Sequence, residues 1–159
     1  MKFIMRVPDI YRSVGDHRAS AFILMLLRVA VGSIFIVHGW HEVSDVPGTI
    51  GAFRDLGLPA VAAYFAITVE VFGGIGLLLG ALTSLSALGP AVAMAFAISF
   101  VHGGRTLFAD SDGWEYPLLL FLLCVYFAVH GAGAYSVDAL FADSHRRFRR
   151  RHRRVAAST

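Results

Sequence analysis

Four long apolar segments constrain the fold of this chain more than any other feature. They cover residues 21–40, 59–82, 85–102 and 115–135. Each approaches or exceeds the roughly 17–25 residues that an α-helix needs to cross about 30 Å of hydrocarbon. The chain is 57% hydrophobic and only 16% charged, and no amphipathic helices are left over to cover four buried helices in water. The sequence therefore predicts an all-α membrane protein, a bundle of four transmembrane helices.

The charged residues outside these segments predict the domain organisation and the orientation. Basic residues concentrate in residues 1–20 and in the tail 141–159, whereas each of the two longer connections carries one arginine. Because basic residues are retained on the cytoplasmic side, we expect both termini in the cytoplasm and the connections outside. The transmembrane domain is then 21–140, between an interfacial N-terminal segment and an arginine-rich tail. Both flanks contain short amphipathic stretches suited to anionic lipid headgroups, so the net charge of +3 does not indicate nucleic-acid binding.

Several function classes are excluded by residues that the sequence lacks. Cys124 is the only cysteine, and thiol–disulfide exchange needs both an attacking and a leaving sulfur. Gly-rich phosphate loops and HExxH or GxSxG motifs are also missing. The first apolar segment is longer than the roughly 7–15 residues of a signal-peptide core. We therefore expect it to be a transmembrane helix and not a cleaved signal peptide.

Polar residues gather at the outer end of the expected bundle. Helix 1 ends there with the stretch IVHGWHE, helix 3 ends there with a histidine, and helix 4 begins there with a glutamate. The residues at this depth are His38, His41, Glu42, His102 and Glu115. The first three share one helical face by their spacing. We expect the set to form an outward-facing pocket that binds a ligand or protons, although contact with headgroups and water stays open for each residue taken singly.

The same residue types also ligate metals. His38, His102 and Glu115 are candidate ligands for zinc, iron or copper. A haem held by the two histidines is a further alternative on four helices. No closely spaced histidine or cysteine pair enforces either group, so neither a metal nor a haem is firmly predicted.

Three ionisable residues lie inside the apolar segments. Glu70 is near the middle of helix 2, where an ionised carboxylate facing lipid would cost several kcal/mol. The small residues that follow it, which mark a face of close helix packing, are Gly73, Gly74, Gly76 and Gly80. We therefore expect Glu70 to point into the bundle and to join the pocket. Arg28 either extends to the interface or pairs with Glu70, and His130 is expected to pack or to form a hydrogen bond.

The chain also resembles a known family. The stretches LLRVAVGSIFIVHGWHE, FRDLGLPAVAAYFAITVEVFGGIGLLLGALTSLSALG, FVHGG, WEYPLLL and GAGAYSVDAL, in this order, are similar to the DoxX family of small bacterial membrane proteins. The resemblance runs from about residue 24 to residue 140. It implies a four-helix bundle in the bacterial inner membrane. His41, Glu42 and the arginine-rich tail depart from the family pattern and inherit no role from it.

The resemblance also implies a functional class. Some DoxX members are described as subunits of quinone-linked oxidoreductases, including thiosulfate:quinone types, and others associate with redox-stress enzymes. The leading hypothesis is a redox-associated subunit whose pocket binds a quinone and passes protons. The alternatives are a non-catalytic scaffold or anchor for a soluble redox-stress enzyme, and a proton or small-solute carrier acting along Glu70. Whether the chain is itself an enzyme, and whether it forms a homo-oligomer, the sequence does not decide.

Overall fold

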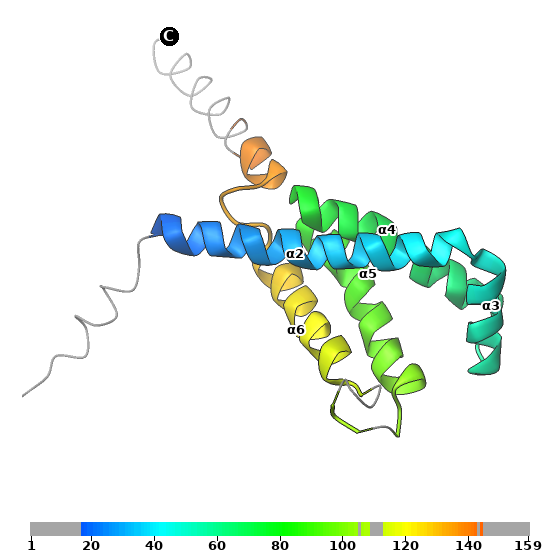
Figure 1. Cartoon of the computed structure of the whole chain (residues 1–159). Helices are drawn as coiled ribbons and strands as arrows, with labels where there is room; N and C mark the ends of the chain where they lie inside the picture. The colour runs from blue at the N-terminus through cyan, green and yellow to red at the C-terminus, as the bar shows by residue number, and fades with distance from the viewer. Residues whose placement is uncertain (1–16, 105, 109–112, 143, 145–159) are drawn as a thin grey trace, which may run out of the picture.

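The structure is a computed structural model that describes residues 17–104, 106–108, 113–142 and 144. Within these residues it is helical throughout, apart from turns and connections (Figure 1). The elements, in chain order, are α2 (His17–Ser44), α3 (Val46–Asp55), α4 (Ala60–Leu79), α5 (Thr83–Phe96), the π-helical turn η1 (Ala97–Val101) and α6 (Glu115–His130). A further helical stretch covers residues 137–142. Most of the predicted N-terminal segment and of the arginine-rich tail lies outside the described residues.

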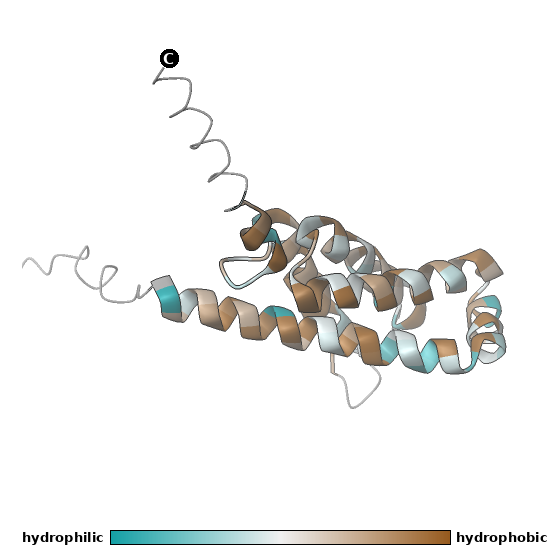
Figure 2. Cartoon of the chain, turned by 90° about the horizontal axis from the view of Figure 1, so that it is seen from above, coloured by the Kyte–Doolittle hydropathy of each residue, from teal (hydrophilic) through white to brown (hydrophobic). Residues whose placement is uncertain are grey.

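The lengths and surfaces of the helices are those of a membrane protein. Three helices are long and apolar enough to cross a bilayer: α2, α4, and α5 together with η1. The fourth, α6, is apolar but has 16 residues, which corresponds to about 24 Å. Large apolar side chains such as Phe72, Leu85 and Val129 are exposed on the outside, and apolar residues cover the helices in Figure 2. The predicted helical membrane bundle is confirmed, and its last helix is shorter than predicted.

The helices pack as two pairs. α2 packs along α4, α5 packs along α6, and contacts between α4 and α5 join the pairs. In Figure 1 the two pairs diverge toward α3 and the connection between η1 and α6. The buried core between the pairs contains Val31, Phe35, Leu77, Ala87, Ala91, Leu120, Cys124 and Phe127. The pairs are therefore held together around this core and separate toward the α3 end.

Glycines allow α4 to approach both of its neighbours. A Cβ atom on Gly74 would lie 2.9 Å from the carbonyl oxygen of Gly32 and 2.9 Å from the main-chain nitrogen of Ile36, both on α2. On the other side of α4, a Cβ atom on Gly73 would lie 2.6 Å from Cγ of Pro90 on α5. The predicted small-residue packing face is confirmed, and it serves two helices rather than one.

Three features differ from the predicted helix boundaries. The connection after α2 is not a plain loop, because α3 occupies most of it. α5 begins at Thr83, before the predicted residue 85, and contains Pro90 in its interior. α6 ends at His130 rather than near residue 135, because Gly131 adopts a φ of 75° that continues no right-handed helix.

The start of α3 is defined by its own side chains. The carboxylate of Asp45 accepts a hydrogen bond of 3.0 Å from the main-chain nitrogen of Gly48, as an N-cap residue does. Pro47 lies in the first turn, where a missing N–H group costs nothing. α3 has no buried residue and packs mainly against α4. It therefore lies over the diverging end of the bundle and not within its core.

Candidate functional site

A cavity of about 280 Å³ opens between the two helix pairs on the side of α3. Residues of α2, α3, α4, α5, η1 and α6 line it, together with Leu56, Leu58 and His102 from the connections. Most of its wall is aliphatic or aromatic. The volume is close to the lower end of the roughly 300–1,000 Å³ typical of small-molecule sites. The polar side chains on the wall are those of His38, Glu42, Glu70, His102 and Tyr116.

Four of the six predicted pocket residues border this cavity. His38 and Glu42 come from α2, Glu70 comes from α4, and His102 directly follows η1. His41 is exposed on α2 and is not part of the wall. Glu115 is the first residue of α6; it is exposed and is not part of the wall either. The next residue, Tyr116, lines the cavity instead. That these residues bind a ligand or protons remains a prediction.

The two carboxyl groups on the wall have no hydrogen-bond partner in the described part of the chain. Glu70 is only 5% exposed, which confirms that it points into the bundle. The Oε2 atoms of Glu42 and Glu70 are both buried, and neither has a hydrogen-bond partner among the residues that the structure describes. The two carboxylates also repel each other when both are ionised. Because an unpaired buried polar atom is costly, the cavity presents two acceptor atoms that a ligand or a proton would satisfy.

Gly39 fixes the position of Glu70 from the neighbouring helix. A Cβ atom on Gly39 would lie only 3.1 Å from the Cβ atom of Glu70 and 2.7 Å from Cγ2 of Val71. The main chain of α2 therefore packs directly against the base of the glutamate side chain. This contact limits the directions that the carboxyl group can take.

The π-helical turn forms the opposite part of the wall. Ala97, Phe100 and Val101 of η1 border the cavity, and the main-chain nitrogen of His102 donates a hydrogen bond of 2.9 Å to the carbonyl oxygen of Ala97. This i→i−5 bond inserts an extra residue into the turn, which changes the direction of the side chains that follow. Single π-helical turns are frequent at functional sites. The irregular backbone thus coincides with the cavity.

His38 and His102, two of the candidate metal or haem ligands, border the same cavity, so one ligand could contact both of them. No group of three or more His, Cys, Asp or Glu side chains in the described part of the chain is placed to hold a metal ion. The metal candidates His38, His102 and Glu115 are therefore not brought together as a site.

Arg28 does not pair with Glu70, which was one of its two expected positions. Its side chain is 2% exposed. Nη1 donates to the carbonyl oxygens of Leu77, at 2.6 Å, and Leu78, at 3.2 Å, and Nη2 donates to that of Tyr135, at 2.6 Å. The partners are thus main-chain oxygens and not the carboxylate of Glu70. Arg28 joins α2 to the end of α4 and to the segment after α6.

Asp138 completes this junction at the start of α5. Its carboxylate accepts hydrogen bonds from the main-chain nitrogens of Leu82, at 2.8 Å, and Thr83, at 3.0 Å. Partial burial alone would raise the pKa of Asp138, but these hydrogen bonds and the charge of Arg28 outweigh it and hold the pKa below its ordinary value. The junction is therefore a network of hydrogen bonds between two charged side chains and main-chain atoms, at the end of the bundle away from α3.

His130 has the packing and hydrogen-bonding role that was predicted. Its Nδ1 atom lies 3.2 Å from the carbonyl oxygen of Tyr126, and the two rings stack with their centroids 4.4 Å apart. It is not part of the cavity wall.

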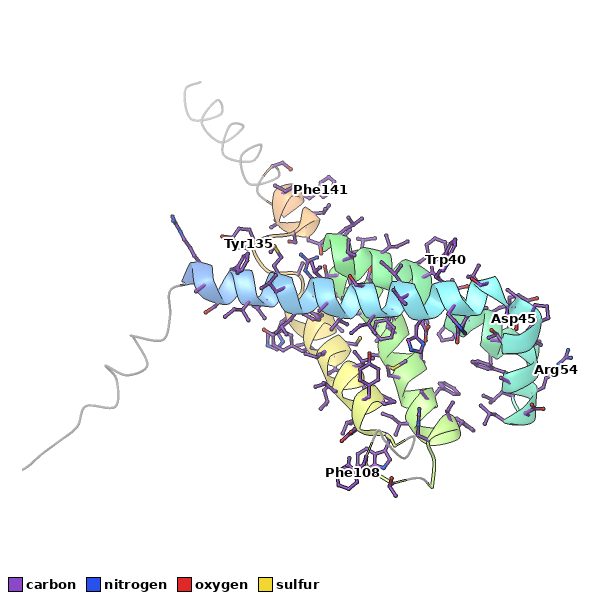
Figure 3. All side chains as sticks on the ribbon, in the orientation of Figure 1. Trp40, Asp45, Arg54, Phe108, Tyr135 and Phe141 are labelled. Atoms are coloured by element: carbon purple, nitrogen blue, oxygen red, sulfur yellow. The ribbon has the colours of Figure 1, made fainter. Side chains whose placement is uncertain are left out.

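The apolar residues of the wall are the part of the site that the sequence did not reveal. Phe53, Leu56 and Leu58 belong to α3 and the turn after it, a connection that was predicted to be a loop. The spacing of Phe53 and Leu56, three residues apart in a segment that follows an Asp-Val-Pro start, is the signal that indicates an amphipathic helix here. Arg54, between them in sequence, points away from the bundle (Figure 3).

Comparison with known proteins identifies relatives over most of the chain. The DoxX family model matches residues 23–103. An uncharacterized protein of Haemophilus influenzae is 35% identical over 124 residues, which are 76% of this chain and 91% of that protein. The Bacillus subtilis protein named "Putative oxidoreductase CatD" is 31% identical over 117 residues, 72% of this chain and 83% of the relative. "Inner membrane protein YqjF" of Escherichia coli is 29% identical over 122 residues, 74% and 90% of the two chains. No solved structure matches.

Proposed function

Because this chain belongs to the DoxX family of membrane proteins, we propose that it is a redox-associated membrane subunit that binds a quinone headgroup in the cavity beside α3. The observation that carries the proposal is the pair of buried, unpartnered carboxyl oxygens of Glu42 and Glu70 in an otherwise apolar and aromatic cavity. A planar ring with two polar oxygens matches such a wall in both respects. The printed name of the Bacillus subtilis relative points to the same class of chemistry.

The wall residues are suited to handling the protons of such a ligand. Interconversion of a quinone and a hydroquinone moves two electrons and two protons, and carboxyl and imidazole groups exchange protons near neutral pH. Glu70 is buried and Glu42 is half-buried, whereas His38 is exposed on α2. In this proposal the carboxyl groups exchange protons with the ligand and His38 exchanges them with water. The electrons pass to or from a redox partner enzyme, the partner class that the family resemblance implies.

A pure scaffold would use its polar residues differently. Carboxyl groups that serve only to fix helix packing would bond to neighbouring helices, as Arg28 does through both of its Nη atoms. Glu42 and Glu70 make no such bond within the described residues. Their arrangement favours a ligand site over a packing role.

The proposed setting is the bacterial inner membrane, with both termini in the cytoplasm. The printed name of the Escherichia coli relative supports this membrane, and the distribution of basic residues supports the orientation. The cavity then faces the outer side, close enough to the interface for exchange of protons with water.

Two histidines on one helix provide a matched test of the proposal. His38 borders the cavity, and His41, three residues later on α2, does not. We expect His38→Ala to weaken binding of a short-chain benzoquinone, taken in both oxidation states, by about tenfold, the contribution of one hydrogen bond to a positioned side chain. His41→Ala should leave it unchanged. The measurement is equilibrium dialysis of the purified protein in lipid nanodiscs against empty nanodiscs.

Equal melting temperatures of the two variants would show that folding does not explain the difference. Absence of any saturable binding by the unaltered protein, or equal effects of the two substitutions, would contradict the proposal and favour the scaffold.

A further inference from the structure

We infer that the cavity, with its carboxyl groups ionised, selects the reduced, hydroxyl-bearing form of its ligand, a hydroquinone, over the oxidised quinone. This inference rests on the proposed function and adds to it which redox form the site retains. It follows from the types of polar group on the wall and from the buried Oε2 atoms of Glu42 and Glu70, which have no hydrogen-bond partner among the described residues.

The cavity offers many hydrogen-bond acceptors and few donors. Its polar wall consists of two carboxyl groups, two imidazoles and the hydroxyl of Tyr116. No Lys, Arg, Asn, Gln, Ser, Thr or Trp side chain is among the described residues that line it. An ionised carboxylate only accepts hydrogen bonds, and a neutral imidazole has one donor and one acceptor. When both carboxyl groups are ionised, acceptor positions outnumber donors, and each proton that a carboxyl group takes up adds a donor.

The two redox forms of the ligand place opposite demands on such a wall. Quinone oxygens are carbonyls, which only accept hydrogen bonds, so a quinone opposite an ionised carboxylate is repelled and leaves that carboxylate unsatisfied. Hydroquinone oxygens carry protons and donate. A hydrogen bond from a hydroxyl to a carboxylate is short and roughly twice as strong as a neutral one. Hence, when the carboxyl groups are ionised, only the hydroquinone satisfies the buried Oε2 atoms of Glu42 and Glu70, whereas a protonated carboxyl group would donate to a quinone oxygen.

The apolar part of the wall does not discriminate between the two forms. Side chains such as Phe65, Phe96 and Phe100 contact a ring of either oxidation state through its faces and edges. The selection therefore depends on the carboxyl groups. Of these, Glu70 is the more firmly placed, because the main chain of Gly39 packs against its Cβ atom.

The test compares the two redox forms of one compound. Binding of tetramethyl-1,4-benzoquinone and of its hydroquinone is measured by anaerobic equilibrium dialysis against the protein in nanodiscs, at one alkaline pH that ionises the carboxyl groups. We expect the hydroquinone to bind at least about tenfold more tightly, the factor that one additional hydrogen bond to a charged group supplies.

Substitution of a single carboxylate sharpens the test. Glu70→Gln replaces an acceptor-only group by an amide that also donates, so it should lower the preference for the hydroquinone and strengthen binding of the quinone. The matched control is Asp55→Asn, which makes the same change on an exposed carboxylate at the end of α3, off the cavity wall. It should leave the ratio of the two affinities unchanged.

A cavity-filling variant separates failure of this inference from failure of the proposed function. Ala62→Phe adds a ring to the wall from α4, and Leu56→Trp, at a more exposed position, replaces it if the first variant does not fold. The quinone could bind as tightly as the hydroquinone, or more tightly, with either cavity-filling variant abolishing that binding. This outcome would overturn the selection but not the proposed function. Absence of binding of both forms, or binding that neither variant changes, would overturn both.

Discussion

Removal of the Arg28 guanidinium should destabilise the protein more than removal of any other charge described here. Arg28→Met keeps the length and the apolar part of the side chain but removes hydrogen bonds of 2.6, 3.2 and 2.6 Å to three main-chain oxygens. The side chain is 2% exposed, so water does not replace the lost donors without local opening. The substitution would loosen the junction between α2, the end of α4 and the segment after α6.

The expected magnitude follows from these bonds. A hydrogen bond to a charged group contributes about 1.5–3 kcal/mol, so the two short bonds together account for about 3–6 kcal/mol. The methionine also no longer requires burial of a charge, which offsets part of the loss. We expect the free energy of unfolding to fall by about 3–5 kcal/mol. For a chain of this size, that corresponds to a fall in melting temperature on the order of 10 °C.

The assay is reversible unfolding of the detergent-solubilised protein by sodium dodecyl sulfate, followed by circular dichroism. Arg54→Met serves as the control, because Arg54 is exposed on α3 and points away from the bundle (Figure 3). It should change the free energy of unfolding by less than about 0.5 kcal/mol. If Arg28→Met were also within about 1 kcal/mol of the unaltered protein, the three carbonyl contacts would not hold the junction, and the reasoning would be refuted.

Three further predictions concern the packing, the junction and the orientation. Gly74→Ala should lower the free energy of unfolding by about 1–3 kcal/mol, because its Cβ atom would lie 2.9 Å from main-chain atoms of α2. Gly51→Ala, whose Cβ atom would have no atom within 4 Å, should stabilise α3 by about 0.5–1 kcal/mol. Unfolding by sodium dodecyl sulfate measures both changes. Because the pKa of Asp138 is lower in the folded state, its ionised form stabilises the fold. This contribution is complete above about pH 4, the ordinary pKa, and is lost as the pH falls through the lower pKa of the folded state. A melting curve series that shows the same acid-induced loss in Asp138→Asn would contradict this assignment. Reporter fusions at Ser111 and after Thr159 should report an outer and a cytoplasmic location, and an outer C-terminus would overturn the proposed orientation.

The sequence predicts the helices of this protein well because lipid imposes a simple rule on them. A spanning helix must be long and apolar, so α2, α4 and α5 with η1 fall where hydropathy places them. The glycines after Glu70 also predict close packing, since only small residues allow it. This rule does not apply to α3, because α3 is too short to cross the bilayer. Its signals are local, an N-cap aspartate and a first-turn proline, and they are easily assigned to a loop.

The candidate site is predictable in its charged residues and not in its geometry. Topology alone brings His38, Glu42 and His102 to one depth, and all three border the cavity. The spacing does not predict η1, since no residue type specifies a π-helical turn. The partners of Arg28 are equally invisible in a sequence, because a carbonyl oxygen belongs to every residue. A prediction based on charges alone therefore pairs Arg28 with Glu70.

The charged side chains at the two ends of the bundle differ in their hydrogen bonding, and this difference supports the proposed ligand site. At the junction, Arg28 leaves its Nε atom without a partner but bonds through both Nη atoms, and Asp138 accepts from two main-chain nitrogens. At the cavity, no hydrogen bond within the described residues satisfies the carboxyl groups of Glu42 or Glu70. Folding alone favours the first arrangement, since each unsatisfied buried group subtracts from stability. The unsatisfied carboxyl groups at the cavity are explained if a ligand forms their missing hydrogen bonds. A ligand should therefore be sought at the α3 end, where the helix pairs diverge.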